Sequence, residues 1–526
     1  MCGSKRVWVS ELIFILLVVK GWWSEGCLEQ ERSALLQLKR FFNGDLRLQN
    51  WVDDEYYLDC CLWEGVECNN TTGRVIKLDL AQTRNWESEE WYMNASLFTP
   101  FQQLESLDLI ENNIAGCVEN EGLEKLSRLN NLKFLHLDYN SFNNSIFSSL
   151  GGLSSLRHLS LFGNRLNGSI DIKGLESLSN LEELDMSDNA IDNLVVPKEL
   201  HNFTNLEGLI LYKSDLHVSQ LLPSIASFTS LKYLSMLDSV LKGALHGQDF
   251  RKFKNLEHLD MGWVQVNVNT SFFQIVGKSM SSLKFLSLTS SSLNKNAILD
   301  QGLCQLVHLQ ELYIGRNDLR GSLPWCLANM TSLQVLDASS NQLTGNISPG
   351  LCELVLLREL YIDYNDLRGS LPWCLANMTS LQVLNASYNQ LTGNISPGLC
   401  ELVLLRELYI DYNDFGGSLR WCLANTTSLQ VLDASCNQLI GNISPSLCEL
   451  VLLRELYIDN NDLRGSLPLC LANLTSLRVL DVSYNQLSEN ISSSLMHLML
   501  MLKSARPWTD QILSPTFMLS TVCSNH

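Results

Sequence analysis

Three polar side chains of this sequence combine the residue types of a serine hydrolase triad. His136, Asp138 and Ser160 could supply the base, the orienting carboxylate and the nucleophile. A triad also needs an oxyanion hole and a pocket, and no sequence feature indicates either. Exposed polar residues on neighbouring strands of a repetitive fold meet by chance, which favours a structural or ligand-contact role. We therefore expect no enzyme activity and no cofactor.

Metal sites and nucleic-acid binding are also disfavoured. The nine histidines are scattered, and no C-x-x-C or H-x-x-x-H spacing occurs. A glycine-rich loop, V-A-I-K and H-R-D, which mark protein kinases, are absent. The net charge of −19 offers no cationic surface to a phosphate backbone. This acidic balance favours basic or neutral partners.

Residues 1–26 have the features of a secretory signal. Lys5 and Arg6 supply the charged start, and an apolar run at 12–19 follows. An uncleaved anchor is the alternative, but the run is short for crossing a bilayer. Sixteen cysteines also suit an oxidising compartment. We therefore expect an extracellular protein.

Glycosylation signals agree with secretion. Sixteen N-x-S/T sequons occur, and beyond those listed next they start at Asn69, Asn269, Asn346, Asn385, Asn394, Asn442 and Asn490. The sites that we select as glycosylated are Asn70, Asn94, Asn143, Asn167, Asn202, Asn329, Asn377, Asn425 and Asn473.

One repeated pattern, L-x-x-L-x-L-x-x-N, runs along the chain and must build the elements that position the polar side chains considered above. Its leucines would point into a coil, and the intervening side chains outward. The Asn would turn inward and bond to backbone groups of adjacent coils. One coil cannot bury its own leucines, so neighbouring coils must stack. Sixteen starts, 24 to 28 residues apart, lie at Leu104, Leu132, Leu156, Leu181, Leu206, Leu231, Leu256, Leu283, Leu309, Leu333, Leu357, Leu381, Leu405, Leu429, Leu453 and Leu477.

Four coils in the middle of the chain depart from the pattern. Ser214, Ser239, Val264 and Ser291 stand where the Asn is expected. This indicates a local distortion, either as a binding segment or as simple decay of the repeat.

The stretch "NQLTGNISPGLCELVLLREL" resembles the plant-specific leucine-rich repeat, and residues 27–80 resemble the N-terminal cap of plant leucine-rich repeat receptors. The cap is indicated by "ERSALLQLKRFF", Trp51, "DCCLWEGVEC" and "GRVIKLDL". The whole is similar to plant receptor-like proteins, which have such an ectodomain without a kinase. The implied fold class is an α/β repeat solenoid. It is a right-handed superhelix with parallel strands on the concave face and 3-10, short helical or loop segments on the convex face.

The resemblance implies a cap, a solenoid at 81–502 with about sixteen repeats, and an irregular tail at 503–526. It also implies disulfides Cys27–Cys60 and Cys61–Cys68 in the cap. The cap would cover the leucine core of the first coil. The tail offers an apolar run of at most eight residues, too short for a bilayer, so we expect a truncated or secreted relative.

The function that the resemblance implies is extracellular recognition of a peptide, glycan or protein ligand in plant defence or development. A partner receptor kinase would transmit the signal, from the apoplast or, with an anchor in the full-length form, the plasma membrane. One alternative is a secreted inhibitor of a cell-wall hydrolase, since polygalacturonase inhibitors have a similar cap and repeat. Another is a soluble decoy derived from a truncated receptor, or a non-functional duplicate.

Four tandem units of 48 residues, each a pair of coils, start at Glu311, Glu359, Glu407 and Glu455. The first two units differ at only four places: Gly315/Asp363, Arg316/Tyr364, Asp337/Asn385 and Ser340/Tyr388. All four changes fall on or beside the outward strand surface, which indicates either ligand contact or tolerance of exposed sites. The ligand-contact residues that we select are Tyr313, Asp337, Tyr361, Asp363, Tyr364, Tyr388, Tyr409, Asp411, Tyr412 and Tyr457. Tyrosine and carboxylate together favour a cationic partner.

Eight cysteines in these units alternate at spacings of 22 and 26 residues. Pairing at 22 leaves none unpaired, whereas pairing at 26 leaves both ends unpaired. Buried free thiols are the alternative. The predicted bridges join adjacent coils on the convex side: Cys304–Cys326, Cys352–Cys374, Cys400–Cys422 and Cys448–Cys470. Cys436, on the concave side, is expected to stay unpaired.

Overall fold

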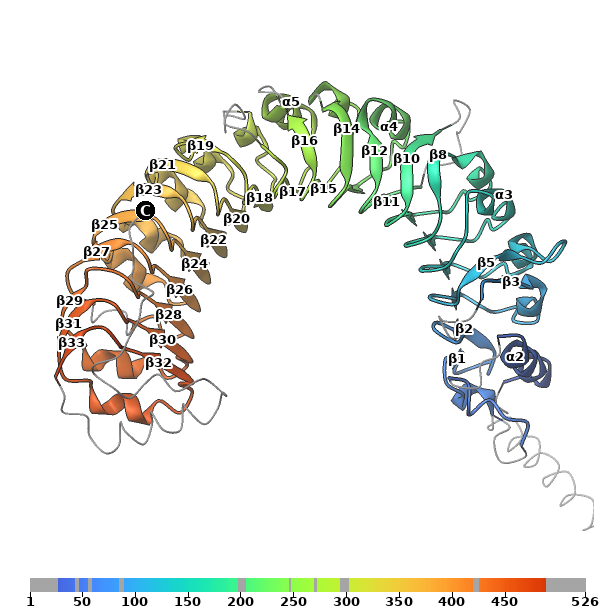
Figure 1. Cartoon of the computed structure of the whole chain (residues 1–526), viewed down its shortest axis with the longest axis horizontal. Helices are drawn as coiled ribbons and strands as arrows, with labels where there is room; N and C mark the ends of the chain where they lie inside the picture. The colour runs from blue at the N-terminus through green and yellow to red at the C-terminus, as the bar shows by residue number, and fades with distance from the viewer. Residues whose placement is uncertain are drawn as a thin grey trace, which may run out of the picture. The chain divides into compact units, whose positions relative to one another are not determined.

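A computed structural model describes residues 27–42, 47–54, 59–84, 89–196, 205–245, 247–268, 272–293, 302–419 and 425–488. The chain divides into two compact units, Met1–Lys242 and Gly243–His526. In each of them, short parallel strands follow one another at the same register along one side (Figure 1). This is the parallel ladder that a leucine-rich repeat solenoid requires.

The ladder of the first unit begins in the cap, where β1 pairs antiparallel with β2, and the later strands pair in parallel. Its strands are β1 (Val66–Cys68), β2 (Val75–Asp79), β4 (Ser106–Asp108), β6 (Phe134–His136), β7 (His158–Ser160), β9 (Glu183–Asp185), β11 (Gly208–Ile210) and β13 (Tyr233–Ser235). Further strands are β3 (Trp91–Met93), β5 (Ile114–Cys117), β8 (Asn167–Asp171), β10 (Ala190–Val195), β12 (Asp215–His217) and β14 (Val240–Leu245). The helices are α2 (Glu29–Phe42), α3 (Ile146–Ser149), α4 (Val218–Ile225), η1 (Cys60–Leu62), η2 (Ala95–Phe98), η3 (Leu123–Arg128) and η4 (Ile172–Leu175).

The second unit carries its ladder on the inner side of its curve (Figure 1). The ladder strands are β15 (His258–Asp260), β17 (Phe285–Ser287), β18 (Glu311–Tyr313), β20 (Val335–Asp337), β22 (Glu359–Tyr361), β24 (Val383–Asn385), β26 (Glu407–Tyr409), β28 (Val431–Asp433), β30 (Glu455–Tyr457) and β32 (Val479–Asp481). Outer strands are β16 (Gln265–Val268), β19 (Arg320–Gly321), β21 (Gln342–Asn346), β23 (Asp366–Gly369), β25 (Gln390–Asn394), β27 (Asp414–Gly416), β29 (Ile440–Asn442), β31 (Asp462–Gly465) and β33 (Gln486–Leu487). Helices are α5 (Phe272–Ser279), η5 (Gly247–Phe250), η6 (Leu303–Gln305), η7 (Trp325–Asn329), η8 (Pro349–Glu353), η9 (Trp373–Asn377), η10 (Pro397–Glu401), η12 (Pro445–Glu449) and η13 (Leu469–Asn473).

The repeated leucines and asparagines hold the coils together as the pattern predicts. Leu357, Leu360 and Ile362 are buried between adjacent coils. Asn365 donates from Nδ2 to the carbonyls of Ile362, Asp363 and Ala338, at 3.2, 3.0 and 3.0 Å. Its Oδ1 accepts from the Leu343 N–H at 3.0 Å. The bond to Ala338 links neighbouring coils, so the inward, coil-linking role of the Asn is confirmed.

The four irregular coils keep their strands and alter the groups beside them. Ser239 takes the place of the Asn: its hydroxyl donates to the Leu211 carbonyl at 2.9 Å and accepts from the Ser214 N–H at 3.1 Å. Val264 is buried and has no polar group to offer. The α-helices α4 and α5 occur in this region, where later coils have 3-10 turns. The ladder therefore survives the loss of the Asn, and the irregularity concerns the other side of the coil.

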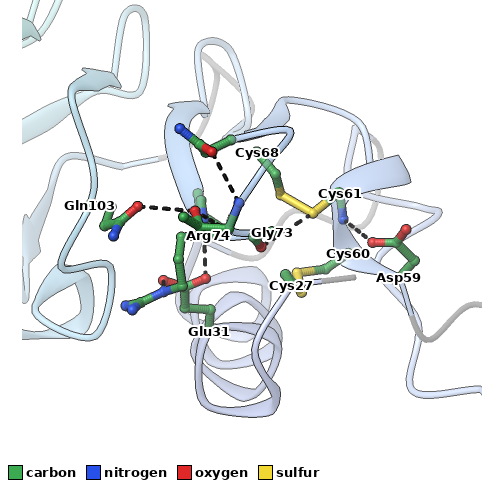
Figure 2. The surroundings of a disulfide bond; sticks show 12 residues. Cys27, Glu31, Asp59, Cys60, Cys61, Cys68, Gly73, Arg74 and Gln103 are labelled. Atoms are coloured by element: carbon green, nitrogen blue, oxygen red, sulfur yellow. Dashed lines mark hydrogen bonds and ion pairs between the residues drawn. A yellow bond between two sulfur atoms is a disulfide. The ribbon is translucent and has the colours of Figure 1, made fainter. Parts of the chain in front are cut away.

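The cap is held together by two disulfides and by a buried carboxylate of α2 that contacts β2 (Figure 2). Glu31 of α2 is fully buried, pairs with Arg74 at 2.7 Å and accepts the Val75 N–H of β2 at 3.1 Å. Trp51 is buried and donates to the Glu64 carbonyl at 2.9 Å. Cys27–Cys60 and Cys61–Cys68 are bonded, with Cα atoms 5.6 and 5.5 Å apart. The pairing is the one that the resemblance implies.

Removal of the second cap disulfide should lower the free energy of unfolding. Replacing Cys61 and Cys68 together by Ser opens a loop with a sequence separation of 7. Chain entropy predicts a loss of about 2.5 kcal/mol. Chemical denaturation of the cap, followed by tryptophan fluorescence, measures it. Cys117→Ser, at a free cysteine, is the control, and an equal loss in both variants would contradict the prediction.

Candidate functional site

The ladder of the second unit presents an alternating column of tyrosine and acidic or amide side chains. From β18 to β32, the last residues of successive strands are direct ladder neighbours. They are Tyr313, Asp337, Tyr361, Asn385, Tyr409, Asp433, Tyr457 and Asp481. We call this column, with the outward residues on both sides of it, the tyrosine–acid face. Five of the ten ligand-contact residues selected from the sequence stand in this column: Tyr313, Asp337, Tyr361, Tyr409 and Tyr457.

Each tyrosine of the column is held by the glutamate that starts its strand. The Tyr361 hydroxyl donates to Glu359 Oε2 at 3.0 Å, and the same bond occurs at Tyr313, Tyr409 and Tyr457. Burial and the glutamate raise the pKa of Tyr313, Tyr361 and Tyr409 far above the ordinary value of 10. These phenols therefore stay neutral, and their half-buried rings form a rigid surface.

The aspartates of the column keep one carboxylate oxygen for their own coil. Asp337 Oδ1 accepts the Ser339 N–H at 2.9 Å and its hydroxyl at 2.6 Å. Asp433 and Asp481 hold Ser435 and Ser483 in the same way, again through Oδ1. Among the described residues, none donates a hydrogen bond to Oδ2 of these aspartates. That oxygen is available to a ligand.

Asn385 changes this arrangement in the middle of the face. The Ser387 hydroxyl turns from its own coil to the carboxylate of Asp411 in the next coil. Asp411 is only 8% exposed, and burial together with Asp433 raises its pKa to about 7. The sequence interpretation selected Asp411 but missed Ser387. The sequence contains a signal for the different role of Ser387. In the other three coils of this kind, an aspartate stands two residues before the serine, and only Ser387 has an asparagine there, at 385.

Asp363 and Asp459 occupy the corresponding place in two other coils. Burial is the main cause that raises the pKa of each to about 6. The Oδ1 atom of Asp363 is buried and has no hydrogen-bond partner. Asp459 accepts a bond from Asn460 at 2.8 Å. Three carboxylates of the face thus titrate in a range where a small change of pH alters their charge.

Tyrosines also line one edge of the face as a stack. Tyr364 and Tyr388 lie with ring centroids 4.2 Å apart and planes at 9°, and Tyr388 and Tyr412 at 4.1 Å and 12°. All three have φ near +50°, the left-handed conformation that this place of the coil adopts along the chain. Arg316, in the same place nearer the start of the unit, lies 5.5 Å from the Trp263 ring centroid. Two of the four sequence changes between the first two units, Arg316/Tyr364 and Ser340/Tyr388, therefore supply two of the three rings of this stack.

The carboxylates of the face have no ion-pair partner within the described ladder. Directly before earlier ladder strands, basic side chains pair with glutamates at the same place in a neighbouring coil: Lys133–Glu105 at 2.7 Å, Arg157–Glu182 at 3.1 Å, and Lys284–Glu257 at 2.6 Å. No such ion pair forms among the described residues from 321 to 488. The tyrosine–acid face is therefore the part of the ladder where carboxylates are left for an external cation.

The residues considered for catalysis are not arranged for it. The Ser160 hydroxyl donates to Asp138, while the imidazole of His136 lies 3.7 Å from Asp108. The three side chains are therefore not linked as a serine–histidine–aspartate relay. An Asp-Phe-Gly tripeptide, which protein kinases share, occurs at 414–416, but here it forms β27 and Phe415 is buried in the core. Within the described ranges, no group of three His, Cys, Asp or Glu side chains could hold a metal ion.

The repeat cysteines join 3-10 turns of adjacent coils. Cys304–Cys326, Cys352–Cys374 and Cys448–Cys470 are bonded, with Cα separations of 5.8, 5.7 and 5.7 Å. Cys400 is bonded too, while its predicted partner Cys422 lies outside the described residues. The expectation for Cys436 was wrong: it is disulfide-bonded, which sequence spacing did not suggest.

The selected sequons lie largely in solvent. Asn94 is half-buried, as the N-cap of η2, and Asn202 lies outside the described residues. Exposed sequon asparagines are Asn70, Asn143, Asn167, Asn329, Asn377, Asn425 and Asn473. Glycosylation of these sites stays a prediction.

Family comparisons agree with this architecture. The leucine rich repeat N-terminal domain matches residues 28–69, and a model of two leucine rich repeats matches 154–198. The single leucine rich repeat matches 308–330, 332–354, 356–378, 380–402, 428–450, 452–474 and 476–498. With the parallel ladder and the capped first coil, these matches define a leucine-rich repeat solenoid.

The homologues of this solenoid are plant receptor-like proteins. Cuscuta receptor 1 of Solanum lycopersicum is 30% identical over 426 residues, which cover 64% of this chain and 37% of that protein. Receptor-like protein 14 of Arabidopsis thaliana is 40% identical over 185 residues, 33% of this chain and 18% of that protein. The chain thus spans well under half the length of these relatives. No kinase domain is detected in it.

Solved plant receptors share the fold. The ectodomain of the receptor kinase GASSHO1/SCHENGEN3 from Arabidopsis thaliana, in complex with CASPARIAN STRIP INTEGRITY FACTOR 2, is 28% identical with a TM-score of 0.56. The match covers 88% of this chain and 59% of that one. A TDR receptor is 26% identical with a TM-score of 0.63, over 77% of this chain and 68% of that one. No helix among the described residues has the length and apolar character to span a membrane.

Proposed function

We propose that this chain is an extracellular recognition protein and that its tyrosine–acid face binds a peptide or protein ligand with cationic groups. The carrying observation is the change along the ladder, from glutamates paired with lysine or arginine to carboxylates without an ion pair in the described range 321–488. Such carboxylates attract a basic partner, and the neutral tyrosines between them provide rigid contact area.

The comparisons support recognition as the class of function. The first relatives bear the names of receptors or receptor-like proteins, and one solved neighbour was crystallised with a ligand. On this basis, the chain acts outside the cell or at the plasma membrane and signals through a partner receptor kinase in defence or development. The ligand contact itself is assigned to Tyr313, Tyr361, Tyr409, Tyr457 and their acidic neighbours.

A triple replacement tests the face. Tyr361→Ala, Tyr409→Ala and Asp411→Ala together should weaken binding of a lysine-rich peptide at least 30-fold, since two aromatic contacts and one charge are lost, each worth on the order of 1 kcal/mol. Fluorescence anisotropy on the secreted chain gives the Kd.

The matched control removes acids from the other side of the same unit. Glu353, Glu401 and Glu449 are exposed and end η8, η10 and η12. Their joint replacement by Gln should change the Kd less than two-fold. If the triple variant binds as the wild type does, or the control loses as much affinity, the tyrosine–acid face is not the site.

A further inference from the structure

The tyrosine–acid face repeats every second coil, and this fixes the distance between equivalent side chains along the column. Tyr313, Tyr361, Tyr409 and Tyr457 are each two ladder steps apart, with Asp337, Asn385 and Asp433 at the steps between. Adjacent strands lie about 4.8 Å apart, so equivalent side chains recur at about 9.6 Å. A ligand that lies along the column meets an aromatic ring and then an acid once in each period.

One peptide conformation has a matching repeat. A polyproline II helix has three residues per turn and rises about 3.1 Å per residue, so every third side chain recurs at about 9.3 Å on the same side. Over the three periods from Tyr313 to Tyr457, the accumulated difference is only about 1 Å. Proline-rich segments in this conformation dock on aromatic-lined surfaces, which the tyrosine column supplies.

We propose that the tyrosine–acid face binds a peptide in the polyproline II conformation that carries a basic residue at every third position. Its prolines pack on the tyrosine rings, and its basic side chains reach Oδ2 of Asp337 and Asp433, the oxygen that the coil itself leaves without a donor in the described residues. This inference rests on the proposed function and specifies the chemistry of the ligand.

Other conformations fit the column less well. In a β-strand, three residues also cover about 10 Å, but successive third residues point to opposite sides. In an α-helix, seven residues cover about 10.5 Å, which accumulates a difference of about 3 Å over three periods. The helix would also place one basic residue per seven on the face, and its 10 to 12 Å diameter exceeds the length of a three-residue strand.

The charges beside the column indicate where on the face a basic ligand lies. The first residues of alternate strands, Glu311, Glu359, Glu407 and Glu455, add a second row of carboxylates with the same period. The arginines Arg358, Arg406 and Arg454 precede these strands and are exposed. They form a separate edge, which would favour acidic groups. A basic ligand therefore lies over the tyrosines and away from this edge.

Three peptides with four lysines each test the spacing. The first is four Pro-Pro-Lys triplets, about 37 Å long in the polyproline II form. The second has the same composition, with the four lysines together at one end. The third is a helical peptide of about 25 residues with its four lysines seven residues apart. The proposal expects the triplet peptide to bind the secreted chain at least ten-fold more tightly than the other two.

The outcomes separate this inference from the proposed function. If the triplet and clustered peptides bind equally, and both lose affinity in the triple variant above, the face binds cations but the spacing inference is wrong. If the helical peptide binds as tightly as the triplet peptide, the proposed polyproline II conformation of the ligand is wrong. If none of the three peptides binds, both proposals fail.

Asn385 allows a test by gain of affinity. It is the only neutral residue among the four steps at 337, 385, 433 and 481. Asn385→Asp completes the acidic row and should tighten binding of the triplet peptide by up to about five-fold, as expected for one added ion pair at a half-buried position. Asn385→Gln is the control, because it also removes the sequon but adds no charge. Equal affinities of the two variants would overturn the assignment of lysine to this row.

Discussion

Asn365→Ala should lower the free energy of unfolding by about 4 kcal/mol. The side chain is buried, and its amide makes three donor bonds and one acceptor bond to the backbone of its own and the preceding coil. Alanine fills none of these roles, and each buried group left without a partner costs about 1 to 3 kcal/mol. The Ala338 carbonyl reduces this cost, because it keeps a second donor, Asn341, at 3.2 Å.

Denaturation by guanidinium, followed by circular dichroism, measures this loss. Because stability in a solenoid is the sum of repeats and their interfaces, the transition should also become less cooperative at the altered coil. Asp366→Ala is the control, since its exposed side chain lies next to Asn365 in the chain and only accepts a bond from Gln390 at 3.1 Å. A loss for Asn365→Ala as small as that of the control would show that the asparagine ladder does not carry the stability of the coils.

The ladder and the cap could be predicted because their chemistry repeats at fixed spacing. Leu360 is buried in its coil for the same reason as Leu384 and Leu408, and the register follows from the period. The pairing at a spacing of 22 also follows, since η8 and η9 lie in adjacent coils and carry Cys352 and Cys374. In the irregular coils, Ser239 makes the hydrogen bond between coils that the Asn makes elsewhere, and the leucine pattern does not reveal this substitution.

The face was predictable in composition but not in its hydrogen bonds and charges. The tyrosines and aspartates could be placed on one column from the period alone. The turn of Ser387 toward Asp411 depends on which of two carboxylates offers the better acceptor, and this requires coordinates. The missing ion pairs likewise depend on neighbours in other coils, such as Lys284 beside Glu257. The bond of Cys436 was missed because no neighbour in the period carries a cysteine at its place.

Asp411→Asn should stabilise the protein at neutral pH and remove part of its pH dependence. The pKa of Asp411 is raised from 3.8 to about 7, mainly by burial and then by Asp433, with Asp363 also contributing. Below pH 3.8 both the folded and the unfolded state are protonated at this residue, and it has no effect. Between pH 3.8 and 7 only the unfolded state is ionised, so unfolding releases a proton and stability falls as the pH rises.

The size of this effect follows from the shift. Each pH unit in the window costs up to about 1.4 kcal/mol, so a shift from 3.8 to about 7 means that Asp411→Asn should recover about 4 kcal/mol at pH 8 and almost nothing at pH 4. The Ser387 hydroxyl keeps an acceptor in the variant, because Asn also offers a carbonyl oxygen. Denaturation of both proteins from pH 4 to 8 measures the difference, with Glu401→Gln on the exposed side of η10 as the control.

Ligand binding has the opposite dependence on the same carboxylate. A cationic peptide favours ionised Asp411, Asp363 and Asp459, so its affinity for the wild type should rise as the pH increases from 5 to 8, through pKa values of about 6 and about 7. Stability and affinity therefore respond to pH in opposite directions, because burial disfavours the charge that the ligand requires. Asp411→Asn should flatten both profiles. If stability flattens while affinity keeps the wild-type profile, Asp411 is a buried structural acid and does not contact the ligand.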